Sequence, residues 1–270
     1  MQTTTDKSIA ITVDNLTVSY GPVPALLDIS VEIPAGQLVG VIGPNGSGKS
    51  TFIKSILGFV KPDVGSVRLF GDDATESKGR VAYVPQRGNV DWDFPVTVRE
   101  VAAMGRYGYR RWWQNLTRED YQHAEDALRK VRMLDLAKRQ IGQLSGGQQQ
   151  RVFMARALAQ DADILLLDEP FAGVDAATER AILDVLNETR KQGKTLVVVH
   201  HDLATAAEYF DQLLLLKQRL FGFGPPKRIL DPELLCQVYE GNLRVFAELQ
   251  RREQASQRDT DKPSNSDQKD

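Results

Sequence analysis

A glycine-rich stretch at residues 43–51, GPNGSGKST, constrains the fold of this chain more than any other feature. Its spacing, Gly-x4-Gly-Lys-Ser, is meaningful as a phosphate-binding loop only where it joins a buried strand to a helix. Residues 37–42, QLVGVI, form a nearly continuous apolar run, as expected of a strand in a parallel sheet with both faces covered. After the loop, Phe52, Ile56 and Phe59 follow helical spacing. The sequence therefore predicts a strand, a loop that wraps phosphate, and a helix.

Further apolar runs extend this unit into a wound α/β core. Residues 80–86, 163–170 and 195–201 are three more candidate strands of the same buried character. Nearer the N-terminus, residues 9–20 and 26–36 alternate or run apolar with β-branched side chains, between glycine and proline turns, which indicates antiparallel strands. The fold class that we predict is α/β, a P-loop NTPase core with an N-terminal antiparallel β subdomain.

The character of the sequence changes at about residues 88–150, where the periodicity is helical and the outer faces are charged. We predict a helical subdomain inserted into the α/β core there. The folded domain as a whole is expected to span residues 9–250. Residues 1–8 are polar and are expected to be flexible, and residues 251–270 have almost no apolar side chains and are expected to be disordered.

The composition limits the classes of function. The 270 residues carry a formal net charge of −2, so no basic field argues for a nucleic-acid partner. Cys236 is the only cysteine, which excludes an internal disulfide and suits a reducing compartment. The start of the sequence lacks the apolar core of a signal peptide, and no run of about 20 apolar residues is present to span a membrane. These features predict a cytoplasmic protein that does not cross a membrane on its own.

The side chains of the glycine-rich loop suit a nucleoside triphosphate. Its backbone N–H groups and the partial positive charge of the following helix start favour phosphate oxygens. Lys49 has the reach to contact the β- and γ-phosphates, and the Ser50 hydroxyl is a ligand for Mg²⁺. We therefore predict an ATP·Mg²⁺ site. Its cofactor-binding residues in the loop are Gly43, Pro44, Asn45, Gly46, Ser47, Gly48, Lys49, Ser50 and Thr51.

Two adjacent acids follow four apolar residues in ILLLDEP, at the end of the strand predicted over residues 163–170. Ligands bind at the carboxyl edge of wound α/β sheets, so Asp168 and Glu169 are expected beside the glycine-rich loop. Asp168 suits the Mg²⁺ shell, and Glu169 suits a base that polarises the attacking water. Two adjacent acids by themselves are more often a solvated strand end, but a phosphate loop in the same chain favours a catalytic role.

A second candidate phosphate-binding segment lies at residues 144–151, LSGGQQQR. Ser145, Gly146 and Gly147 precede a helical pattern, and free N–H groups at a helix start favour an anion. Because the glycine-rich loop already surrounds the β-phosphate, this second segment has to meet the γ-phosphate from another side. The residues alone leave open whether it does so in the same chain or in a partner.

These three motifs, GPNGSGKST, LSGGQQQR and ILLLDEP, occur in an order and spacing that resembles the nucleotide-binding domains of ATP-binding-cassette (ABC) systems. The likeness covers nearly the whole chain up to the C-terminal helices, and LSGGQ is highly specific to that superfamily. The resemblance implies an ATPase whose domains pair head to tail as a homodimer. It places each ATP between the glycine-rich loop of one copy and the second segment of the other, at Ser145, Gly146, Gly147 and Gln148.

Other positions take roles by the same resemblance. Tyr20 resembles the aromatic residue that stacks on adenine, with an ordinary edge-strand tyrosine as the alternative. Gln86 in YVPQ resembles the glutamine that contacts Mg²⁺ or water and hinges the helical subdomain. Asp175 in AGVD lies where the family crosses the dimer interface, although AGVD departs from the commoner serine-containing version.

Two adjacent histidines precede Asp-Leu in VVVHHDL. His201 resembles the histidine that contacts the γ-phosphate, which leaves His200 as a strand-end residue. A histidine pair also suits a metal ion, but adjacent strand residues point to opposite faces, which argues against that role. The predicted catalytic residues are thus Glu169, His201 and Gln86, and the predicted Mg²⁺ ligands are Ser50, Gln86 and Asp168.

The resemblance also indicates what the ATPase drives. With no fused membrane segment, second ATPase half or coiled-coil insertion, the chain is similar to separate importer subunits that dock on a membrane permease. Residues 89–113 are similar to the corresponding segment of ATPases that serve manganese, zinc and iron importers. We therefore predict a subunit at the cytoplasmic face of the cell membrane. Its partners would be integral permease subunits and, indirectly, a metal-binding solute-capture protein, and not nucleic acid.

Several alternatives stay open from the sequence. An importer ATPase for another solute is the nearest, and a non-transport ABC ATPase such as an iron–sulfur assembly factor is a different class. A non-enzymatic clamp is disfavoured because all the hydrolytic residues are present. An aromatic and arginine cluster is either a docking surface or an exposed loop with its tryptophans folded back. It consists of Tyr107, Tyr109, Arg110, Arg111, Trp112 and Trp113.

Overall fold

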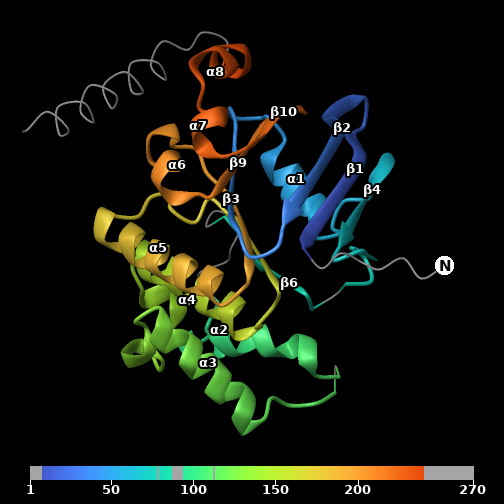
Figure 1. Ribbon diagram of the computed structural model, residues 1–270. Coiled ribbons are helices and arrows are strands. Elements are labelled where there is room, and N and C mark those ends of the chain that lie inside the picture. Colours follow the sequence, from blue (N-terminus) through green and yellow to red (C-terminus); the bar gives the residue numbers. More distant parts are fainter. Residues whose placement is uncertain (1–7, 78, 87–93, 112, 240–270) are drawn as a thin grey trace, which may run out of the picture.

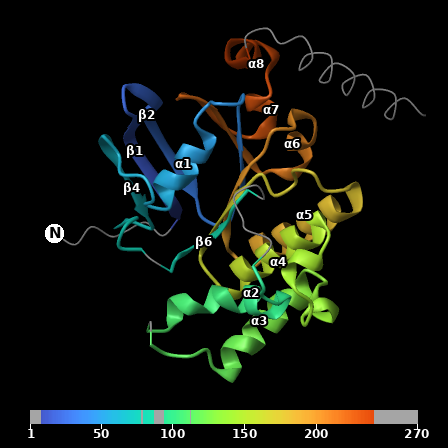
Figure 2. The same cartoon turned by 180° about the vertical axis from the view of Figure 1, so that it is seen from behind.

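Figure 1 shows the computed structural model of the chain, which describes residues 8–77, 79–86, 94–111 and 113–239. The predictions of a flexible start at residues 1–8 (except for Ser8), of a domain end at residue 250 and of a disordered tail at residues 251–270 lie outside these described residues. Within them the chain forms two β-sheets, with helices packed between and around the sheets and a further group of helices at one end of the molecule (Figures 1 and 2). The predicted α/β fold class is confirmed.

The larger sheet consists of β3 (Leu38–Ile42), β6 (Val81–Val84), β7 (Ile164–Asp168), β8 (Thr195–Val199), β9 (Gln212–Lys217) and β10 (Arg219–Gly224). Its strand order is β10-β9-β3-β8-β7-β6. Neighbouring strands from β9 to β6 run parallel, and β10 pairs antiparallel with β9 at the edge. Strands β3, β7 and β8 are buried over their whole length, which explains their continuous apolar sequences.

The smaller sheet consists of β1 (Ile9–Tyr20), β2 (Val23–Pro34), β4 (Val64–Leu69) and β5 (Asp72–Asp73). Its strands pair antiparallel in the order β2-β1-β4-β5, and this sheet is the β subdomain that the sequence predicts. Helix α1 (Lys49–Ile56) fills the space between the two sheets, where Phe52, Ile53 and Ile56 are fully buried. The glycine-rich loop that precedes α1 is therefore held between two sheets.

Helices cover the opposite face of the larger sheet, namely α5 (Ala176–Lys191), α6 (Leu203–Tyr209), α7 (Pro226–Ile229) and α8 (Pro232–Tyr239). Helix α5 is followed by Gly193 at φ +86, a conformation that glycine adopts readily at the end of a helix. The Asp231 carboxylate accepts N–H groups at the start of α8, at 3.0 Å from Glu233. None of the helices in the described residues is long and apolar enough to cross a lipid bilayer.

The group of helices at one end of the molecule, here called the helical layer, is inserted between β6 and β7. It consists of α2 (Val98–Ala103), η2 (Met104–Tyr109), α3 (Arg118–Lys130), η3 (Leu134–Leu136), η4 (Ile141–Gln143) and α4 (Gly146–Ala159). Helices α2, α3 and α4 pack on one another, and α4 also packs on β6. The insertion is as predicted, and its boundary near residue 150 stays a prediction because α4 continues to Ala159.

A buried carboxylate joins η2 to α3 inside the helical layer. Asp120 is fully buried and accepts hydrogen bonds from Arg110 Nε at 2.8 Å and from the Thr117 backbone N–H at 2.8 Å. Arg106 Nε lies 3.4 Å away. Burial by itself raises the pKa of Asp120, but the hydrogen bonds from Thr117, Arg110 and Arg106 outweigh burial and hold that pKa below its usual range. Two arginines of the η2 region are thus anchored within the chain.

Candidate functional site

The glycine-rich loop joins β3 to α1 at the carboxyl edge of the larger sheet. Gly48 has φ +97, and a Cβ there would lie 2.6 Å from the Ala25 carbonyl oxygen, so only glycine fits. Gly43 is confined in the same way, because an added Cβ would lie 2.0 Å from the Leu216 carbonyl oxygen. No side chain caps the start of α1, which leaves its N–H groups for a ligand.

Lys49 is buried in the curve of this loop. Its Nζ donates to two carbonyl oxygens of the loop, at 2.8 and 2.9 Å. Burial lowers the pKa of Lys49, and the carboxylates of Glu169 and Asp168 oppose that shift. The Ser47 hydroxyl is buried and has no hydrogen-bond partner among the described residues. A buried ammonium and an unpartnered hydroxyl suit the oxygens of a phosphate.

The remaining loop positions divide between the surface and the interior. Asn45, Gly46 and Ser50 are exposed, whereas Pro44 is half-buried and Thr51 is buried in α1. The Thr51 backbone oxygen accepts the Ser55 hydroxyl at 2.9 Å, as in an ordinary helix interior. Of Ser50 and Thr51, Ser50 is therefore the residue whose hydroxyl a ligand can reach from solvent.

Asp168 ends β7 and is 3% exposed. Its Oδ1 atom has no hydrogen-bond partner among the described residues. Burial raises the pKa of Asp168, whereas a hydrogen bond with the Ser50 hydroxyl opposes that shift. A buried carboxylate oxygen without a partner, next to a serine hydroxyl, fits the oxygen ligands that a divalent cation requires.

Glu169 has a left-handed backbone conformation, with φ +50, which is uncommon for a residue other than glycine, asparagine or aspartate. Its Oε2 accepts a hydrogen bond of 2.8 Å from Gln86 Nε2. Gln86 follows β6, and β6 lies beside β7 in the sheet. The structure therefore brings the predicted catalytic residues Gln86 and Glu169 into contact.

The two histidines differ in their surroundings. His201 follows β8, which lies between β3 and β7, and its side chain is exposed. His200 is 2% exposed, and its ring centroid lies 5.9 Å from that of His201. Within the described part of the chain, no group of three or more histidine, cysteine, aspartate or glutamate side chains could hold a metal ion. The interpretation of His200 as a strand-end residue did not anticipate its burial.

The second predicted segment forms the start of α4. The Ser145 N–H donates to Gln148 Oε1 at 2.9 Å, and the Gln148 N–H donates to Ser145 Oγ at 3.4 Å, which makes a capping box. Ser145 is exposed, and Gly146 and Gly147 are half-buried. Both of these hydrogen bonds lie within the start of α4, and neither reaches the glycine-rich loop.

Asp175 lies near this segment as the cap of α5. Its carboxylate accepts the Thr178 N–H at 2.8 Å and the Thr178 hydroxyl at 3.1 Å, and these bonds lower the pKa of Asp175. A Cβ added at Gly147 would lie 3.1 Å from Thr178, so the starts of α4 and α5 are in contact. Tyr20, the predicted adenine-stacking residue, ends β1 with its side chain 53% exposed.

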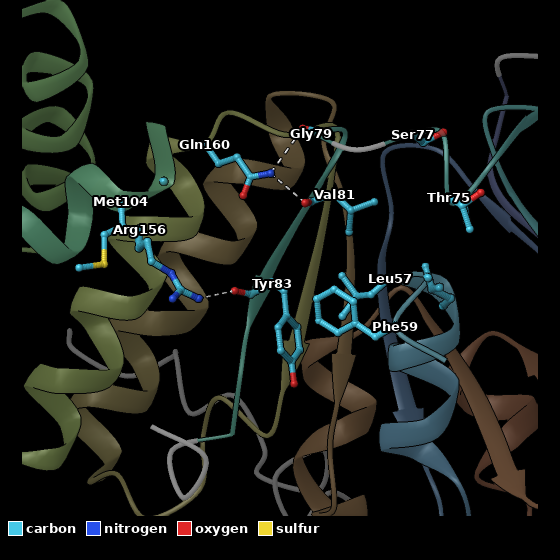
Figure 3. A pocket seen from close by; sticks show the side chains of 14 residues that line it. Leu57, Phe59, Thr75, Ser77, Gly79, Val81, Tyr83, Met104, Arg156 and Gln160 are labelled. Atoms are coloured by element: carbon cyan, nitrogen blue, oxygen red, sulfur yellow. Dashed lines mark hydrogen bonds between the residues drawn. The ribbon is translucent and has the colours of Figure 1, made fainter. Parts of the chain in front are cut away.

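A cavity of about 820 Å³ opens between the larger sheet and the helical layer. Figure 3 shows side chains that line it, from α1 and its end (Leu57, Phe59), β6 (Val81, Tyr83), η2 (Met104) and α4 (Arg156, Gln160). Arg156 Nη2 donates to the Tyr83 carbonyl oxygen at 2.9 Å, and Gln160 Nε2 donates to the Val81 carbonyl oxygen at 2.8 Å. Helix α4 is thus bound to β6 along one wall.

No sequence motif indicates this cavity, because its walls come from four separate segments of the chain. One local signal was the Gly58 that precedes Phe59: α1 ends at Ile56, so Phe59 lies beyond the helix in which its spacing placed it, and it is 71% exposed. The predicted aromatic and arginine cluster adjoins the cavity, because the Tyr109 hydroxyl donates to the backbone oxygen of Gln160. Tyr107, Tyr109 and Trp113 are each more than half exposed, and Trp112 lies outside the described residues.

Comparison with known proteins places this arrangement in a family. The sequence profile of the ABC transporter family matches residues 26–172. The chain is 55% identical to the manganese transport system ATP-binding protein MntB of Bacillus subtilis, over 85% of this chain and 92% of that protein. It is 49% identical to the zinc transport system ATP-binding protein TroB of Treponema pallidum, over 87% of this chain and 88% of that protein.

A solved structure agrees with these sequence relatives. The crystal structure of a nucleotide-free ATP-binding cassette from an ABC transporter has a TM-score of 0.76 and 27% identity, over 86% of this chain and 98% of that chain. Both comparisons support the resemblance that the three sequence motifs indicate. The chain therefore belongs to the ABC transporter family, as one of its ATP-binding ATPase subunits.

Proposed function

We propose that this ATPase drives the import of a divalent transition metal, namely manganese, zinc or iron, through a separate membrane permease. The choice of a transition metal as the transported ion is supported by two relatives: the chain is 55% identical to a manganese transport system ATP-binding protein and 49% identical to a zinc transport system ATP-binding protein. In this proposal the chain binds permease subunits at the cytoplasmic face of the cell membrane. A metal-binding solute-capture protein delivers the ion to the other side of the permease.

We propose that ATP binds along the glycine-rich loop, with its adenine on the exposed Tyr20 ring. Lys49 would exchange its two loop carbonyl partners for the β- and γ-phosphate oxygens, to which its charge is better matched. Mg²⁺ would be held by Ser50, Asp168 and Gln86, and it would neutralise charge on the phosphate oxygens. The unpartnered Asp168 Oδ1 supports this assignment.

Glu169 and His201 are the residues that we assign to hydrolysis. Glu169 lies beyond β7 with one oxygen, Oε2, bonded to Gln86 and the other available to polarise an attacking water. His201 reaches the same sheet edge from β8, so it would contact the γ-phosphate from the side of the sheet next to β3. Replacing Glu169 with glutamine should keep ATP bound while turnover falls by about 10²- to 10⁴-fold.

We propose that the γ-phosphate is completed by the second segment of another copy of the chain, in a head-to-tail homodimer. The support is that Ser145 is exposed and forms a capping box with Gln148, while the glycine-rich loop belongs to a different part of the fold. Gly146, Gly147 and Gln148 would offer N–H groups and Ser145 its hydroxyl. Asp175, at the adjoining start of α5, would lie at the same dimer seam.

The single observation that best supports coupling to a permease is the contact of Gln86 with Glu169 at 2.8 Å. Gln86 lies three residues beyond Tyr83, which lines the cavity between the sheet and the helical layer. A permease helix seated against Phe59 and Met104 would therefore press on the strand that leads to the hydrolytic carboxylate. The exposed aromatic rings beside the cavity suit such a protein contact.

The test is reconstitution of the chain with its co-expressed permease in proteoliposomes, with ATP hydrolysis and uptake of manganese, zinc and iron measured in parallel. Phe59→Asp should abolish uptake and release the subunit from the permease. Val64→Asp is the matched control, because Val64 is a comparably exposed apolar residue on β4 that does not line the cavity.

Three results would contradict the proposal in different ways. Uptake of an unrelated solute would make the chain an ATPase of another importer. ATP hydrolysis without a co-purifying permease would favour a non-transport role, such as iron–sulfur assembly. Equal uptake by the Phe59 and Val64 variants would remove the cavity as the docking site.

A further inference from the structure

His200 is a buried titratable residue to which the proposed mechanism gives no role. It directly follows β8, and its backbone N–H donates to the Val41 carbonyl oxygen at 3.0 Å, which binds it to the strand that leads into the glycine-rich loop. Its side chain is 2% exposed. A polar ring so deeply buried beside an active edge requires an explanation, because polar groups are normally buried only with specific partners.

The ring of His200 packs against aromatic residues from two segments of the chain. Phe171, two residues after Glu169, meets it edge-on with centroids 5.5 Å apart. Phe210, just beyond α6, lies at 5.4 Å, and Tyr209 lies at 5.9 Å. The His200 ring therefore packs between the segment that begins at Glu169 and the segment that follows His201.

A chain of hydrogen bonds extends from the same ring. His200 Nε2 lies 2.8 Å from Thr205 Oγ1, and the Thr205 hydroxyl is 3.1 Å from Asp202 Oδ2. Since a hydroxyl has one proton, donation to the carboxylate leaves Nε2 as the N–H donor to Thr205. Asp202 in turn caps α6 by accepting the Ala204 N–H at 2.8 Å. These bonds fix the turn that contains His201.

Burial lowers the pKa of His200 to about 4, so the ring is neutral near pH 7 and carries a single N–H. A neutral ring packs among aromatic side chains without an unpaired charge, and its one N–H is used by Thr205. Both features suit a rigid spacer and not a proton carrier.

We propose that His200 is a positioning residue, which holds the turn of His201 against the segment of Glu169 and Phe171 so that the His201 side chain meets the γ-phosphate. This inference rests on the proposed function, because it assumes the γ-phosphate role of His201. It assigns to His200 no contact with the nucleotide.

The experiment compares affinity for Mg·AMP-PNP with affinity for Mg·ADP, since only the first ligand has a γ-phosphate. His200→Phe keeps the ring packing and removes the bond to Thr205. We expect it to weaken Mg·AMP-PNP binding about fivefold, the loss that corresponds to one hydrogen bond, and to leave Mg·ADP binding unchanged. Thr205→Val should have the same selective effect, and Thr205→Ser, which keeps the hydroxyl, should bind both ligands as the parent protein does.

A second background distinguishes positioning from general stabilisation. In the His201→Ala protein, His200→Phe should cause no further loss of Mg·AMP-PNP affinity, because the residue acts through His201. An equal loss for both nucleotides, or a fivefold loss that persists without His201, would overturn the proposal. If His200→Phe fails to fold, the Thr205 pair gives the same comparison.

Failure of the proposed function has a separate signature. A parent protein that binds Mg·AMP-PNP and Mg·ADP equally, and in which His201→Ala changes neither affinity, would contradict the γ-phosphate role of His201 and with it this inference. A parent protein that prefers Mg·AMP-PNP, with a His200→Phe variant that keeps the full preference, would contradict the inference alone.

Discussion

The starts of α1 and α4 are two glycine-flanked helix N-termini suited to phosphate, yet the chain builds them in opposite ways. Helix α1 begins after Gly48 without a side-chain cap, and Ser47 in its loop accepts the Gln218 N–H at 2.8 Å through its backbone oxygen. Helix α4 begins after the exposed Ser145, with a complete capping box to Gln148. The first start is held by the surrounding fold, and the second is satisfied by its own side chains.

Because the two helix starts are built differently, one chain can carry two phosphate-binding segments that do not compete for the same ligand. Uncapped N–H groups are free to bind phosphate, so the start of α1 presents a site that one chain forms by itself. A capped helix is stable without a ligand, and the Gln148 N–H to Ser145 Oγ distance of 3.4 Å is long for a hydrogen bond. Exchanging that bond for a phosphate oxygen of another copy would therefore cost little.

The largest effect should come from the first helix start. Lys49→Ala removes the buried ammonium, and we expect kcat/KM for ATP to fall about 1000-fold, because ground-state contacts and transition-state charge stabilisation are lost together. Isothermal titration should show weaker ATP binding by the isolated chain. Undiminished binding and turnover would show that the glycine-rich loop is not the nucleotide site.

The second helix start should affect hydrolysis without affecting binding to one chain. Ser145→Arg places a bulky cation at the exposed segment, and we expect turnover to fall about 100-fold through loss of transition-state contacts. The ATP affinity of the monomer should stay within about twofold of the parent value, since α4 is not part of the site that one chain forms by itself. A large loss of monomer affinity would put both segments in one site of the same chain.

Mixing the two variants decides between these arrangements. A mixed head-to-tail dimer has one site in which an intact loop meets an intact second segment. Random pairing makes about half of the dimers mixed, so about a quarter of the parent turnover should return on mixing Lys49→Ala with Ser145→Arg. Turnover that stays at the level of the separate variants would contradict a shared site.

The smallest effect that we expect is on the free energy of unfolding. Ser145→Ala deletes the capping oxygen of α4 and should lower the free energy of unfolding by about 1 kcal/mol. Ser47→Ala removes a buried hydroxyl with no hydrogen-bond partner among the described residues, so it should be close to neutral or slightly stabilising. Urea unfolding of both variants checks the contrast, and equal losses would mean that the two helix starts are built alike.

Much of the site could be predicted from the sequence because its parts are local. The glycines at 43 and 48, Lys49 and the acids at 168 and 169 each follow a short apolar strand, and their roles depend on the few residues around them. The sequence also distinguishes buried parallel strands from strands with one exposed face, since β3, β7 and β8 are apolar throughout and β1 alternates.

The contacts that could not be predicted from the sequence are those that depend on the order of strands in the sheet. Gln86 meets Glu169 only because β6 lies beside β7, across 83 residues of sequence. The cavity needs the same neighbours, since Arg156 on α4 reaches across to Tyr83 on β6. The burial of His200 needs Phe171 and Phe210, from two separate segments of the chain, to pack against its ring. No local pattern encodes such meetings.

The hydrogen bond from Gln86 to Glu169 bears on how much ATP the cell uses when the subunit is not transporting. While this bond lasts, the Gln86 amide occupies Glu169 Oε2 and leaves only the second carboxylate oxygen to polarise the attacking water. Copies of the subunit without a bound permease would then hydrolyse ATP slowly, and fast hydrolysis would begin only where a permease is bound.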